Sequence, residues 1–136
     1  MSLLIALFLV VHGGIHVGFL CSRSWPFEPG DPGLVSGLGV APDTAAVVGA
    51  VLALVAFLGF LLAGLAAVGL LPARLWRPLV VAASVASATV LVLFVTPGTL
   101  PGLVIDGVLL WAVGVRDWRP KRLIGGRVQA ARPVTS

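Results

Sequence analysis

Residues 45–71 read AAVVGAVLALVAFLGFLLAGLAAVGLL, a run of 27 residues without a charged side chain. A bilayer core of about 30 Å is crossed by roughly 20 apolar residues in an α-helix. At about 40 Å of helix, this run must tilt, bend or extend beyond the hydrocarbon. Three further apolar runs lie at about residues 3–21, 79–95 and 101–115. The sequence therefore predicts an all-α integral membrane bundle of four transmembrane helices, forming a single domain over residues 1–136.

The composition excludes most other classes of protein. Of the 136 residues, 59% are hydrophobic and 10% are charged, and the mean hydropathy is +1.12. A soluble domain carries about 25% charged residues, so this chain lacks the polar surface of a water-soluble globule. The apolar runs exclude a disordered chain. A single cysteine, Cys21, excludes an internal disulfide, a CxxC redox centre and a cysteine-rich zinc site.

The distribution of charge predicts the orientation of the helices, because Lys and Arg are enriched in cytoplasmic segments. The connection 72–78 and the tail 116–136 are basic, whereas the connection 22–44 carries three acidic residues and one arginine. Both termini are therefore expected in the cytoplasm of a bacterial cell, with the protein crossing the inner membrane several times. The basic residues on the expected inner side are Arg74, Arg77, Arg116, Arg119, Lys121, Arg122, Arg127 and Arg132. They are expected to attract anionic lipid headgroups, at about 1 kcal/mol each, and not nucleic acid.

The connections between the apolar runs predict loops and interfacial anchors. The long outer loop, residues 22–44, contains four prolines, which remove backbone donors and disfavour a regular element. Pro101 suits the first turn of the last helix. Trp76 and Trp118 are expected in the aromatic belt at the inner interface.

Three ionisable residues fall inside the predicted spans: His12, His16 and Asp106. Such groups are costly in a membrane and point to a functional site by default. The two histidines are four residues apart and share one helix face. Counting from the outer helix ends places His16 about 9 Å deep and Asp106 about 7 to 8 Å deep, with His12 one turn deeper. The sequence therefore predicts a His16–Asp106 pair that brings the first and last helices together.

Several roles are open for this cluster. The pair would hold two helices together as structural polar contacts, or relay protons. In an enzyme, His12, His16 and Asp106 would be the catalytic residues, with a histidine oriented by a carboxylate acting as the base. Two histidines and one remote carboxylate are a weak metal pattern without an HExxH motif, so neither a metal site nor a cofactor is predicted.

Further polar and aromatic residues are candidates for ligand binding. The outer loop combines aromatic, acidic and turn residues and is longer than a connection requires, so it is a candidate lid over the cluster; its alternative role is interfacial anchoring. Ser84 and Ser87 share one side of the third helix, but no GxSxG elbow supports a serine nucleophile. The candidate ligand-binding residues are Trp25, Glu28, Asp31, Ser84, Ser87 and Trp111.

The run HGGIHVGF at residues 12–19, together with GTLPGLVI at residues 98–105, resembles a set of small four-helix bacterial membrane proteins. Their first helix begins with an HGxIHxxGF-like motif, and a GT-containing turn precedes their last helix. The resemblance covers about a quarter of the chain. It implies a four-helix inner-membrane fold and no established activity, and Asp106 lies outside its pattern. The bias toward Ala, Gly, Val and Arg is typical of a bacterium with a GC-rich genome.

Three classes of function follow from these expectations. The first is a small inner-membrane protein that binds a hydrophobic ligand or a partner protein. The second is a membrane-embedded enzyme that acts on a lipid-like or small apolar substrate. The third is a proton-coupled small transporter, which must oligomerise because four short spans enclose little space.

Overall fold

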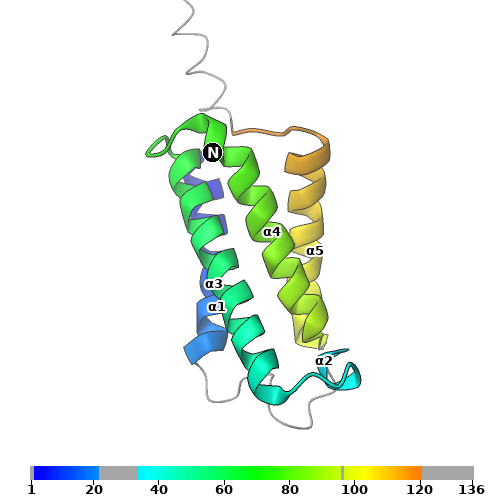
Figure 1. Cartoon of the computed structure of the whole chain (residues 1–136). Coiled ribbons are helices and arrows are strands. Elements are labelled where there is room, and N and C mark those ends of the chain that lie inside the picture. The colour runs from blue at the N-terminus through cyan, green and yellow to red at the C-terminus, as the bar shows by residue number, and fades with distance from the viewer. Residues whose placement is uncertain (1, 22–33, 96, 121–136) are drawn as a thin grey trace, which may run out of the picture.

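The computed structural model of the chain describes residues 2–21, 34–95 and 97–120, and every regular element within them is a helix (Figure 1). The α-helices are α1 (Ser2–Cys21), α2 (Leu34–Gly37), α3 (Pro42–Ala67), α4 (Trp76–Leu93) and α5 (Leu100–Leu109). The shorter turns are the 3₁₀ helices η1 (Ala73–Leu75) and η2 (Pro97–Thr99) and the π-helix η3 (Leu110–Val115), which continues α5. The prediction of an all-α fold is confirmed.

Each long helix packs against the next one along the chain: α1 against α3, α3 against α4, and α4 against α5. Figure 1 shows α4 between α3 and α5, with α1 behind α3. Within the described residues, helices α1 and α5 do not pack closely against each other. The main core is rich in alanine, which lets the helices approach closely, and Phe60 and Trp76 are its largest side chains.

Two helices are long and apolar enough to cross a membrane: Pro42–Ala67 and Ala73–Leu93. The apolar segments Ser2–Val17 and Leu100–Val115 are shorter. The long helices therefore agree with membrane insertion by length and composition, whereas the number of spans depends on the two outer helices.

The ends of α3 have clear local causes. The helix begins at Pro42, three residues before the expected start, because proline is well tolerated in a first turn. It ends at Ala67 although apolar residues continue to Leu71. Gly69 has a φ of +84°, its N–H donates to the Ala66 carbonyl, and the Leu70 N–H donates to the Leu65 carbonyl. This is a Schellman termination, which depends on glycine in the left-handed conformation.

Two expectations about the connections are wrong. The outer loop contains a regular element, α2, because its four residues follow the last of three closely spaced prolines and hold no proline themselves. Trp76 does not lie in an exposed aromatic belt: it is 1% exposed and belongs to the main core. Trp118 is 42% exposed and packs edge-to-face on it, with ring centroids 6.3 Å apart.

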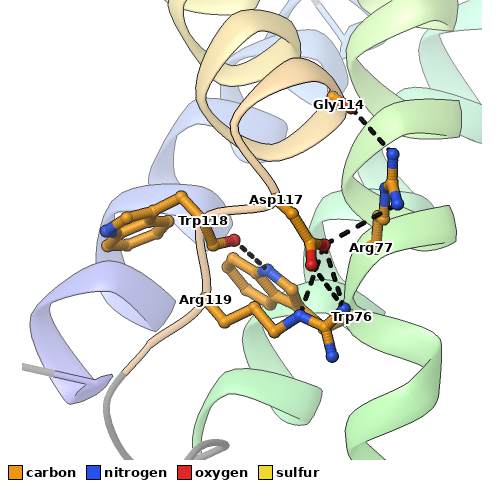
Figure 2. Close-up of polar contacts among 6 residues, drawn as sticks. All are labelled: Trp76, Arg77, Gly114, Asp117, Trp118 and Arg119. Atoms are coloured by element: carbon orange, nitrogen blue, oxygen red, sulfur yellow. Dashed lines mark hydrogen bonds and ion pairs between the residues drawn. The ribbon is translucent and has the colours of Figure 1, made fainter.

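Hydrogen bonds and ion pairs join the residues after α5 to the start of α4, as Figure 2 shows. Trp76 Nε1 donates a hydrogen bond to the Trp118 carbonyl, and Arg77 donates to the Gly114 carbonyl at the end of the π-helix. Asp117 pairs with Arg77 at 3.7 Å and with Arg119 at 2.9 Å. These contacts fix residues 116–119 over one end of the bundle. Arg77 and Asp117 are half exposed, so their pairing contributes at most about 1 kcal/mol.

Candidate functional site

Four buried polar side chains from three helices meet in the interior. His12 and His16 come from α1, Ser87 from α4 and Asp106 from α5. Asp106 and Ser87 are fully buried, and the two histidines are 5% and 2% exposed. A buried carboxylate requires hydrogen-bonding partners to offset its lost hydration, and this arrangement supplies them from two other helices.

The hydrogen bonds converge on the Asp106 carboxylate. His12 Nε2 lies 3.1 Å from Asp106 Oδ1, and Ser87 Oγ donates to Asp106 Oδ2 at 2.5 Å. His16 Nε2 lies 2.8 Å from Ser87 Oγ. The hydrogen bonds therefore run from His12 through Asp106 and Ser87 to His16. Helix α1 contributes the residues at both ends of this series.

The positions of the hydrogens follow from the donors available. A serine hydroxyl has one hydrogen, and Ser87 gives it to Asp106, so His16 Nε2–H donates to Ser87 Oγ. An ionised carboxylate only accepts hydrogen bonds, so with Asp106 ionised His12 Nε2–H donates to it. Both imidazoles then carry a hydrogen on Nε2.

This geometry corrects the expected pairing. The histidine bonded to Asp106 is His12, whereas the bond of His16 is to the hydroxyl of Ser87. The two histidines are one helical turn apart on the same face, about 6 Å along the axis, so the direct partner of Asp106 lies one turn from the expected histidine. Ser87 lies between His16 and the carboxylate, bonded to both.

Local sequence explains how α1 presents the histidines. Gly13 lies against α3, and a Cβ atom there would come within 3.0 Å of the Phe60 Cβ. The His12 ring packs edge-to-face on Phe60, with centroids 5.0 Å apart, and on His16 at 5.9 Å. Glycine therefore lets α1 approach α3 closely, and the aromatic contacts hold the His12 ring in position.

A half-open pocket of about 150 Å³ lies beside this cluster, between α1 and α5. His12 and His16 form its polar wall together with Thr99. Its other lining residues are Ile15, Leu91, Gly98, Pro101, Gly102 and Ile105. A cavity beside the cluster was one expectation for the outer loop, but its place between α1 and α5 has no signal in composition or spacing.

The remaining candidate ligand-binding residues lie outside the pocket or outside the described part of the chain. Ser84 is fully buried, and its hydroxyl has no hydrogen-bond partner within the described chain. Trp111 is 55% exposed and lies on the π-helix, where the Arg116 guanidinium lies 4.9 Å from its ring centroid, so it is not part of the pocket. Trp25, Glu28 and Asp31 lie outside the described residues. In the part of the chain that the structure describes, no group of three or more His, Cys, Asp or Glu is arranged to hold a metal ion.

No protein-family model, curated protein or solved structure matches this chain. The resemblance of residues 12–19 and 98–105 to small four-helix membrane proteins therefore stays a prediction.

Proposed function

We propose that this protein is a four-span bundle of the bacterial inner membrane that binds a hydrophobic ligand in the pocket between α1 and α5. The membrane assignment is supported by the outward faces of the helices. On α1 the exposed side chains are apolar, whereas the buried face carries His12 and His16. A soluble amphipathic helix has the opposite arrangement, so the bundle suits a lipid surrounding.

The length of the outer helices supports four spans. Helix α1 has 20 residues, about 30 Å at 1.5 Å per residue. Helix α5 and the π-helix together cover Leu100–Val115, about 24 Å by the same measure. A short span is accommodated by local thinning of the bilayer.

The charges at the ends of the bundle support the orientation. Arg77 and Arg119 meet at Asp117 (Figure 2), and Arg74 and Arg116 lie on the turns beside them. With this end in the cytoplasm, all four arginines are on the side that the positive-inside rule requires. Anionic lipid headgroups are then the expected partners of this end and of the basic tail.

The observation that carries the proposed ligand-binding function is the pocket wall. Two buried histidines, one of them hydrogen-bonded to a fully buried carboxylate, line a mostly apolar pocket. Apolar pockets with a few fixed polar groups are the usual form of a small-molecule site. The enzyme and transporter alternatives would use the same residues, but the Ser87 proton is committed to Asp106, so Ser87 is poorly placed as a nucleophile that His16 deprotonates.

Native mass spectrometry of the full chain, extracted from its own membrane in mild detergent, tests this function. We expect a bound lipophilic molecule that is lost in Ile15→Trp, because Ile15 lines the pocket. Val11→Trp is the matched control, since Val11 lies one turn away with almost the same exposure, 57% against 54%. Equal occupancy in both variants, or a second protein chain without a small molecule, would overturn the proposal and favour an accessory subunit.

A further inference from the structure

The pocket between α1 and α5 has the size of a single ring. A cavity of about 150 Å³ lined by apolar side chains holds one benzene molecule, and this pocket has about that volume. The part of a ligand that enters is therefore one ring or a short chain.

The residues that line the pocket favour a ligand group without charge. None of the described residues that line the pocket is Lys, Arg, Asp or Glu. Among the described residues, the Asp106 carboxylate lies behind His12, with its Oδ1 3.1 Å from His12 Nε2. A carboxylate or phosphate in the pocket would meet no cation among the described lining residues, and an ionised Asp106 would repel it in a medium of low dielectric constant.

The positions of the hydrogens on His12 favour a ligand group that donates a hydrogen bond. His12 Nε2 is committed to Asp106, and a neutral imidazole that donates from Nε2 accepts at Nδ1. The group that best complements His12 is therefore a hydroxyl, which donates its hydrogen to the ring.

The surrounding rings favour an aromatic hydroxyl over an aliphatic one. Of the rings that His12 contacts, that of His16 also lines the pocket, at a centroid distance of 5.9 Å, and aromatic groups pack favourably on such rings. Gly98 and Gly102 leave part of the wall without side chains. The Cβ of an alanine at 102 would come within 2.8 Å of Leu91 Cδ1, and Leu91 also lines the pocket.

We infer that the ligand carries a single phenolic ring on an apolar tail, with the ring in the pocket and its hydroxyl donating to His12. This inference rests on the proposed function. The tail leaves between α1 and α5, which are not closely packed and where Ile15 and Leu100 are more than half exposed. That path leads to the acyl chains of the surrounding lipid.

The test is a native mass spectrometry titration of the full chain in dodecylmaltoside with matched probes. The probes are 4-octylphenol, 4-octylanisole and octylbenzene, which share the ring and tail and differ in the hydroxyl. We expect 4-octylphenol to bind about tenfold tighter than the other two, the effect of one hydrogen bond. His12→Phe should abolish the preference, and Ile15→Trp should weaken all three probes while Val11→Trp does not.

The outcomes separate the two proposals. If the three probes bind equally and Ile15→Trp weakens them all, the pocket binds apolar ligands but the phenol assignment is wrong. Two further probes test the ring and the hydroxyl separately. If 1-decanol binds tighter than 4-octylphenol, the assignment of an aromatic ring is wrong. If 4-octylbenzoate binds tighter, the assignment of a neutral hydrogen-bond donor is wrong. If no probe is sensitive to Ile15→Trp, both proposals are wrong. The probe series in the unmodified protein decides the matter even if His12→Phe does not fold.

Discussion

At the scale of single residues, Ser87 determines what the polar cluster can do. In a catalytic triad the carboxylate orients the histidine, and the histidine takes the proton of the serine. Here the serine itself bonds to the carboxylate, and His16 donates to the serine. Ser87 therefore acts as a bridge between α1 and α5, which supports a structural contribution from this hydroxyl beside the ligand-facing role proposed for His12.

Replacing this bridge should destabilise the protein. Ser87→Ala leaves an oxygen of Asp106 and the Nε2–H of His16 without their partner in a buried site. We expect the free energy of unfolding to fall by about 1–3 kcal/mol, measured by SDS titration in detergent micelles. Ser84→Ala is the control, because Ser84 is equally buried on the same helix and its hydroxyl has no partner in the described chain. Ser84→Ala should leave the unfolding free energy unchanged or raise it; equal losses in both variants would contradict the bridging role.

The sequence predicted the members of the cluster better than their pairing. His12, His16 and Asp106 were identifiable because ionisable groups are rare in apolar spans. Which histidine meets Asp106 depends on the relative depth of two helices, and helix ends are uncertain by one or two residues each. That uncertainty approaches one turn, which is the spacing between the histidines. The bridging position of Ser87 has no local signal, since serine is common in membrane helices.

At the scale of elements, the contact between α3 and α4 depends on a small residue. A Cβ atom on Gly59 would lie 2.7 Å from the Ala83 Cβ and 3.3 Å from its Cα. Neither atom can move without shifting the backbone of α4. The close approach of these two helices therefore requires glycine at position 59.

Gly59→Ala should lower the free energy of unfolding by about 1–3 kcal/mol, because overpacking forces the helices apart. Gly107→Ala tests whether the loss is specific to that contact. A Cβ at Gly107 meets no described atom within 4 Å, and alanine has the higher helix propensity, so this variant should be neutral or more stable. SDS titration of both variants measures the difference. If Gly107→Ala costs as much as Gly59→Ala, the close packing of α3 on α4 is not the cause.

The helix boundaries show which local signals a hydropathy reading misses. Helix α4 was expected from residue 79, because Pro78 was read as part of a turn, but it begins at Trp76. A proline in the first turn of a helix removes no intrahelical hydrogen bond. The π-helix Leu110–Val115 has no signal in the sequence, and it is held at its end by the bond from Arg77 to Gly114. Its existence depends on tertiary contacts with the start of α4.

At the scale of the whole molecule, the order of packing explains where a pocket forms. Each of the long helices α1, α3 and α4 packs on the next long helix, which leaves α1 and α5 as the outer members of the row. The polar cluster joins these two helices through His12, Asp106 and Ser87, while the space beside it stays open as the pocket. The same arrangement thus supplies both the buried polar wall and a lateral opening between the helices.

The four-span orientation makes a prediction about every connection. In a Cys21→Ser background, single cysteines at Val40 and Gly98 should react with a membrane-impermeant maleimide in intact cells. Cysteines at Ser2, Arg74 and Arg116 should react only after permeabilisation, because four spans place all three in the cytoplasm. Positions 40, 74, 98 and 116 are solvent-exposed in the described bundle, so burial does not explain a lack of labelling there.

The pattern of labelling distinguishes the alternatives to four spans. If only α3 and α4 cross the membrane, positions 40 and 74 still label on opposite sides. Positions 2 and 116 would then both label in intact cells, because α1 and α5 would lie on the outer side together with positions 40 and 98. Such a result would also undermine the proposed ligand route, since the opening between α1 and α5 would no longer face the acyl chains. Labelling of position 74 and not position 40 in intact cells would invert the orientation and contradict the charge argument.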